Sequence, residues 1–122
     1  MGDQELLSML AAEADRRGPT IISGIEELIA SGKKDPDRIE QLRVEAHGLK
    51  GAALVVGQER LADLARRIEE FLADSVKSGQ IKPGSAATVI AGTSAFNEGA
   101  HAAAEGGTEP SSVGDSLVAL GT

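Results

Sequence analysis

The sequence predicts an all-α protein, an antiparallel up-and-down four-helix bundle with a kinked or split N-terminal helix. Two observations predict this fold class. Apolar residues recur at alternating spacings of three and four, as in helices that bury one face, and no segment alternates apolar with polar residues as a strand does. Aromatic residues make up only 2% of the chain, with no Trp or Tyr, so the core must consist of Leu, Ile, Val and Ala, which suits packed helices.

The first helix is expected to begin near Asp3, which can cap it, and to continue past an interruption at Gly18-Pro19. Proline lacks a backbone donor, and its ring clashes with the carbonyl of Asp15. Because the apolar phase is the same on both sides of the interruption, we predict a kinked helix or two short helices that share one buried face. The apolar stripe comprises Leu6, Leu7, Leu10, Ala11, Ala14, Ile21, Ile22, Ile25, Leu28 and Ile29.

Three further helices are predicted. Asp35-Pro36 opens the second, with the aspartate as cap and the proline in the first turn. Gly57 marks a tight turn into a third helix over about 58–77, and a weaker fourth helix is expected over about 82–104. The core stripes of the second and third helices are Ile39, Leu42, Ala46, Leu49, Ala53 and Val56, and Leu61, Leu64, Ala65, Ile68, Leu72 and Val76.

We divide the chain into a helical bundle over residues 1–104 and a flexible linker or tail over residues 105–122. The tail contains the run Gly-Gly-Thr-Glu-Pro-Ser-Ser, which has the composition of a linker. Its apolar residues 116–120 can add a helical turn.

Composition excludes several classes of function. The net charge is −7, which argues against nucleic-acid binding. The chain has no cysteine, and therefore neither disulfides nor a thiolate metal site. No apolar run approaches the ~20 residues of a membrane span, and no signal peptide is visible, so we expect a cytoplasmic protein with no membrane partner.

The most informative stretch is Ala46-His47-Gly48-Leu49-Lys50-Gly51-Ala52-Ala53, because two glycines inside a helix need a compensating reason. At 100° per residue, His47 lies off the core stripe and faces outward. Arg43 and Lys50 border it, four residues before and three after. A second row that is apolar or bare runs along nearly the opposite side of the helix from the core: Val44, Gly48, Gly51 and Val55.

A single exposed imidazole can bind metal, act as a general base or serve as a nucleophile. A metal site is not expected, because the only other histidine, His101, is remote in sequence and receives no role here. A nucleophile for phosphoryl transfer fits better; attack by Nε2 needs the neutral ring, with the proton held on Nδ1 by an acceptor. A hairpin turning at Gly57 brings Glu69 close to His47, so Glu69 is the expected Nδ1 partner.

The neighbours of His47 fit the same chemistry. Lys50, one turn along, is expected to screen the charge of a phosphoryl group, and Gly51 to leave an open lane for an incoming aspartyl phosphate and its carrier. The residues expected to form the docking surface for that carrier are Arg43, Val44, Gly48, Leu54 and Val55. We expect no cofactor on this chain, and place any magnesium ion on the partner receiver.

The stretch around His47, followed by Gly57, resembles the motif of histidine-containing phosphotransfer (HPt) domains. The resemblance extends from about residue 3 to residue 100. The segment 61–70 also resembles HPt domains. The run 71–79 and the spacing from His47 to Glu69 are similar to the amino-terminal phosphotransfer domain of chemotaxis-type histidine kinases.

This resemblance implies a four-helix bundle with His47 exposed in the middle of a helix. It also implies that the protein is a phosphoryl carrier more than an enzyme. His47 would exchange a phosphoryl group with an aspartate of a response-regulator receiver domain in a two-component phosphorelay. Lys50 and Gly51 would support the site, and Glu69 would orient the imidazole. The other implied partner is a histidine kinase catalytic domain, in trans or in a longer chain, since this sequence has no Gly-rich phosphate loop for ATP.

Two residues depart from the family's pattern. Gly48 stands where these domains usually carry a small polar residue, and Arg66 stands where the chemotaxis subgroup often has another histidine. The alternative function is a helical adaptor or dimerisation domain that keeps this fold without phosphotransfer. A metal-binding bundle is a remote third reading.

Overall fold

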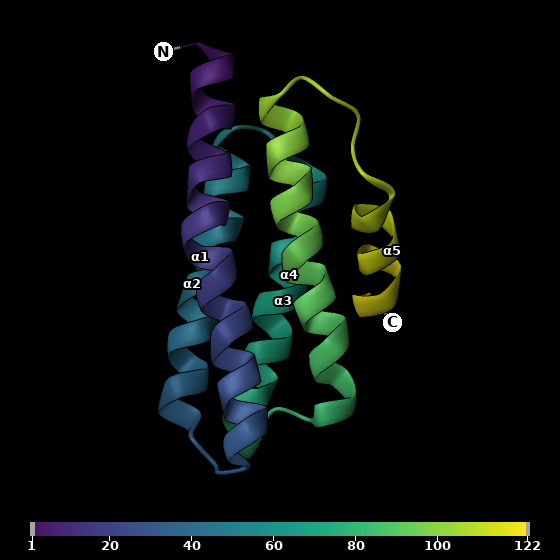
Figure 1. Cartoon of the computed structure of the whole chain (residues 1–122). Coiled ribbons are helices and arrows are strands. Elements are labelled where there is room, and N and C mark those ends of the chain that lie inside the picture. The colour runs from purple at the N-terminus through teal and green to yellow at the C-terminus, as the bar shows by residue number, and fades with distance from the viewer. Residues whose placement is uncertain (1, 122) are drawn as a thin grey trace.

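The computed structural model of the protein describes residues 2–121, most of which lie in helices (Figure 1). The five helices are α1 (Asp3–Ser31), α2 (Pro36–Val55), α3 (Glu59–Ser78), α4 (Pro83–Ala104) and α5 (Ser111–Leu120). Within these residues there is no strand. The all-α class predicted from the sequence is therefore confirmed.

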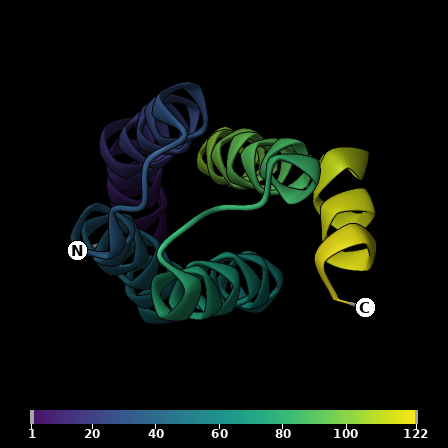
Figure 2. The same cartoon turned by 90° about the horizontal axis from the view of Figure 1, so that it is seen from below.

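The first four helices form the expected up-and-down bundle. Each packs against the next along the chain, and α1 also packs against α4, which closes the ring (Figure 2). Short connections make sequential neighbours antiparallel. The largest fully buried side chains of these helices are Phe96, Leu10, Ile21, Ile25, Ile39, Leu42, Leu49, Leu64, Ile68, Leu72 and Val89.

Helix α1 is continuous through its proline. It runs for 29 residues, with Pro19 inside it, so the alternative of two separate helices is not realised. The apolar stripe explains why the helix persists, since Ala14 before the proline and Ile21 and Ile25 after it are all fully buried. Packing of one continuous face outweighs the local cost of a missing backbone hydrogen bond.

The α2–α3 hairpin positions the residues that matter for function. Asp35 caps α2 by accepting a hydrogen bond from the backbone N–H of Arg38 at 3.1 Å. At the other end, Gly57 adopts a φ of 74°, which glycine tolerates better than other residues. Gly57 and Gln58 donate their N–H groups to the carbonyls of Leu54 and Ala53, and this closure reverses the chain within three residues.

The segment expected as a flexible tail contains the docked helix α5. This helix packs against α3 and α4 (Figure 2). Its side chains Val113 and Leu117 are buried. Two glycines of α4 make room for it: a Cβ at Gly99 would lie 3.0 Å from Val113, and one at Gly92 would lie 2.8 Å from Leu120. A ten-residue helix is marginal alone, so this seat on the bundle stabilises it. The domain boundary after residue 104 stays a prediction.

A further property bears on location. Among the helices of residues 2–121, none combines the length and the apolar character needed to cross a membrane.

Candidate functional site

His47 projects from the outer face of α2, with 61% of its side chain exposed. Its Nδ1 atom lies 3.0 Å from Oε2 of Glu69 on α3. The contact spans 22 residues of sequence, and it depends on the tight turn at Gly57 that sets α3 antiparallel to α2. The structure thus brings together the two residues that the sequence paired as imidazole and acceptor.

Glu69 is the centre of the polar cluster at this site. Only 13% of its side chain is exposed, and it also accepts from Lys50 Nζ at 2.8 Å and from Arg43 Nη1 at 2.9 Å. Burial raises the pKa of Glu69, but the hydrogen bonds that Lys50 and His47 donate outweigh burial, so the pKa lies below the usual value for glutamate. Glu69 is therefore a carboxylate at neutral pH and acts only as an acceptor.

This arrangement selects one tautomer of the neutral imidazole. Because a carboxylate can only accept, the hydrogen between His47 and Glu69 must reside on Nδ1. Nε2 of the neutral ring then carries the lone pair, on a side chain that is mostly in solvent. The neutral ring therefore keeps the lone pair of Nε2 free of this contact, with the proton fixed on Nδ1.

The two cations predicted beside His47 are both joined to Glu69. Lys50 contributes its ammonium to one carboxylate oxygen, while Arg43 shares the other oxygen with the imidazole. Arg43 is also bonded through Nε to Glu40 on its own helix, at 2.7 Å. Arg43, expected on the docking surface, is thus more than two-thirds buried within this network.

The two glycines of the motif differ in their surroundings. A Cβ at Gly51 would meet no atom within 4 Å, so the surface one turn after His47 is open. A Cβ at Gly48 would lie 2.5 Å from Nη1 and 2.6 Å from Nε of Arg17, a residue of α1. The space beside Gly48, expected to belong to a bare strip, is occupied by that guanidinium.

Three predicted docking residues of α2 are exposed apolar side chains. Val44 is 49% exposed, Leu54 58% and Val55 77%. Exposed aliphatic side chains are usually scattered singly, whereas these lie on the same helix as the exposed His47. Val44 lies three residues before His47, and Leu54 and Val55 lie seven and eight residues after it. The open position of Gly51 lies between them in the sequence.

The sequence did not predict that Arg17 lies beside Gly48, because Arg17 is thirty positions before His47 and belongs to α1. The available signal was Gly48, the first glycine of the motif, which indicated close approach without naming the residue. Arg66, the other departure from the family's pattern, bonds Asp63 and Glu70 of its own helix. It therefore adds no contact to the imidazole in the described chain.

The other histidine, His101, lies apart from this cluster. It is on α4 and bonds Asp15 on α1 through Nε2 at 2.7 Å, on the α1–α4 side of the bundle.

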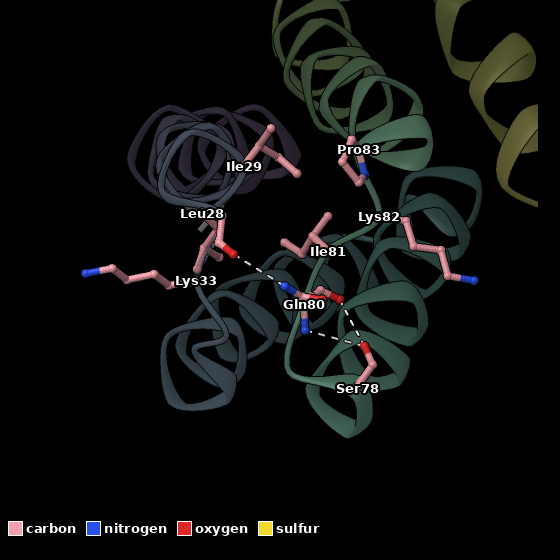
Figure 3. Close-up of a pocket in the computed structure, with 9 residues that line it drawn as sticks. Leu28, Ile29, Lys33, Ser78, Gln80, Ile81, Lys82 and Pro83 are labelled. Carbon is pink, nitrogen blue, oxygen red and sulfur yellow. Dashed lines mark hydrogen bonds between the residues drawn. The ribbon is translucent and has the colours of Figure 1, made fainter.

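A cavity of about 250 Å³ lies between the end of α1 and the α3–α4 connection (Figure 3). It is lined by Leu28, Ile29, Gly32, Lys33, Ser78, Gln80, Ile81, Lys82 and Pro83, none of which was predicted as a site residue. Within residues 2–121, no group of three or more potential ligands is placed to hold a metal ion.

Comparison with known proteins gives the family to which the chain belongs. No curated protein matches the chain. The family model described as Hpt domain matches residues 5–104, which spans α1 to α4 and includes His47 and Glu69. With most of its length matched, and with four helices in a closed ring around one core, the chain belongs to the Hpt domain family.

Proposed function

We propose that His47 carries a phosphoryl group to or from the aspartate of a receiver domain. Hpt domains perform histidine phosphotransfer in phosphorelays, so the general activity follows from the family. The observation that carries the specific proposal is the contact between Nδ1 of His47 and Glu69 on a ring that is 61% exposed. Such a ring is oriented on one side and accessible to a visiting protein on the other.

In the proposed reaction, Nε2 of His47 attacks the phosphorus atom of an aspartyl phosphate on the receiver. The N–P bond forms, the bond between phosphorus and the acyl oxygen breaks, and the aspartate leaves as a carboxylate. The proton on Nδ1 stays between the imidazole and Glu69. Glu69 then faces a ring whose positive character rises as the N–P bond forms, which favours that state. The reverse sequence returns the phosphoryl group to the aspartate.

Lys50 and Gly51 are proposed to support this transfer. Lys50 lies one turn from His47, and its ammonium can move from Glu69 to a phosphoryl oxygen by rotation of a flexible side chain. A Cβ at Gly51 would meet no atom within 4 Å, so the surface one turn after His47 is open. Since helical side chains lean toward the N-terminus, a larger residue at this position would cover His47.

The receiver is proposed to dock on the exposed side chains of Val44, Leu54 and Val55. Their exposure, 49% to 77%, provides apolar contact area around the histidine. Arg43 contributes less directly, since Glu69 and Glu40 already hold its guanidinium. The proposed site is an open surface, which suits a protein partner better than a small molecule. The likeness to the chemotaxis-type kinases remains a prediction.

The test uses phosphoryl label supplied by a phosphorylated receiver domain or by an active histidine kinase. The wild-type protein is expected to take up label that is acid-labile and alkali-stable, as a phosphohistidine is. The variant His47→Gln should take up none. His101→Gln is the matched control, because it removes the chain's other histidine, which lies on the α1–α4 side, and it should label as wild type.

Two results would contradict the proposal. Label that persists in His47→Gln would place the phosphoryl group elsewhere. A wild-type protein that takes no label from any donor would support the adaptor function instead.

A further inference from the structure

Arg17 of α1 occupies the space that a side chain at Gly48 would fill. A Cβ at that position would lie 2.5 Å from Nη1 and 2.6 Å from Nε of the arginine. The glycine immediately after His47 therefore accommodates a charged group from another helix. Gly51, which has no atom within 4 Å of its Cβ position, shows by contrast that the motif's glycines serve different purposes.

The guanidinium of Arg17 is held in this place by two carboxylates. Nε bonds Glu13 of α1 at 2.9 Å, and Nη1 lies 3.5 Å from Glu45 of α2. The side chain is 22% exposed, so one part of it still reaches solvent. Among residues 2–121, no hydrogen bond or ion pair uses Nη2. An orientated arginine with a remaining donor is suited to bind an anionic group of a partner.

The position of Arg17 complements the polar cluster on the other flank of α2. Arg43 and Lys50 lie toward α3 and are both joined to Glu69, whereas Arg17 approaches from α1. Positive groups therefore flank the histidine helix on both sides. A receiver that carries an aspartyl phosphate presents negative charge to this surface.

We propose that Arg17, seated on Gly48, is a docking residue for the anionic phosphoacceptor end of the receiver domain. This inference rests on the proposed function of His47. Arg17 does not touch the reacting atoms; it favours association of the two proteins and the register in which they meet. A charge at the edge of an interface acts mainly on the association rate and on its salt dependence.

The competing explanation is purely structural, since Arg17 also joins α1 to α2 through Glu45. A structural role predicts a loss of stability with an unchanged KM for the receiver at every salt concentration. A docking role predicts a higher KM for the receiver with kcat nearly unchanged. It also predicts that the defect shrinks as salt screens the charges.

The experiment measures the kinetics of transfer to His47 from a receiver domain of the same genome, phosphorylated on its aspartate with acetyl phosphate. Arg17→Gln removes the charge and keeps most of the stem, and Arg17→Lys restores the charge. Arg16→Gln is the matched control, because Arg16 is the neighbouring residue and also bonds Glu13 but is 62% exposed. Both glutamine variants change the net charge equally.

A second arm displaces the guanidinium without removing its charge. In Gly48→Ala the new methyl group overlaps the end of a flexible side chain, which can move aside, so the fold is retained. The docking role predicts that this substitution raises KM in the wild-type background. In the Arg17→Gln background it should have almost no further effect, because the group on which it acts is gone.

For low salt we expect Arg17→Gln to raise KM about fivefold, Arg17→Lys to recover part of that loss, and Arg16→Gln to change KM less than about twofold. Equal KM values for Arg17→Gln and Arg16→Gln would overturn the inference while leaving the function of His47 intact. An equal effect of Gly48→Ala in both backgrounds would also overturn it. A wild-type protein that takes no label at all would overturn the proposed function and this inference together.

Discussion

Replacing Glu69 by Gln tests the physical basis of the site most directly. The substitution keeps the shape of the side chain and removes the negative charge of the carboxylate. The oxygens of this carboxylate accept hydrogen bonds from Lys50, Arg43 and His47 at 2.8, 2.9 and 3.0 Å. With its oxygen at the Oε2 position, the amide can still accept from Arg43 and His47, while the amide nitrogen cannot accept from Lys50.

The loss of stability follows from the hydrogen bond of Lys50 that remains unmade and from the lost charge of the acceptor in the other two. A hydrogen bond to a charged group contributes about 1.5–3 kcal/mol when buried, but the donors here are about a quarter or more exposed and regain water. We therefore expect Glu69→Gln to lower the free energy of unfolding by about 1–2 kcal/mol at pH 7. A neutral acceptor also holds the His47 ring less firmly, which should slow uptake of label at His47 about tenfold.

The pH dependence of this loss provides an independent check. Because the folded state lowers the pKa of Glu69, its stabilisation is complete above the unfolded pKa of about 4.3 and is lost as pH falls through the folded value. The difference in unfolding free energy between wild type and Glu69→Gln should therefore narrow below about pH 4. Urea unfolding followed by circular dichroism at pH 7 and pH 3 measures both differences.

Glu70→Gln is the control, because this neighbour on α3 is 62% exposed and bonds only Arg66 among the described residues. It should change stability by less than about 0.5 kcal/mol and leave labelling unaffected. If Glu69→Gln behaved like Glu70→Gln in both measurements, the role assigned to the buried carboxylate would be wrong.

Three further substitutions have defined outcomes. Lys50→Ala should slow phosphoryl transfer about tenfold, measured as single-turnover labelling, and cost less than about 1 kcal/mol of stability; normal transfer would refute the screening role. Gly51→Ala should stabilise the protein by about 1 kcal/mol in urea and yet slow labelling of His47, and faster labelling would contradict the open-lane argument. Leu117→Ala should weaken docking of α5 by about 2 kcal/mol, which would be measured as faster amide exchange over 111–120. Labelling of His47 should be unchanged, because α5 contacts α3 and α4 and His47 lies on α2; a labelling defect would show that α5 is coupled to the site.

Local patterns in the sequence determined the helices and the position of the histidine. The apolar spacing of α2 and α3 predicted most of the buried residues, although Val56 and Val76 are only half-buried, and it placed His47 on the outer face. Counting from the turn at Gly57 was enough to predict that Glu69 lies near the imidazole, because a tight hairpin fixes the register of two adjacent helices.

Only the tertiary structure decided which groups meet outside the α2–α3 hairpin. The continuity of α1 through Pro19 depends on packing of its whole buried face, and the docking of α5 depends on room left by two glycines of α4. The seat of Arg17 on Gly48 depends on the spacing between α1 and α2. Periodicity indicates which face of a helix is buried. The partners of a long charged side chain on another helix depend on interhelical distances, which no local pattern encodes.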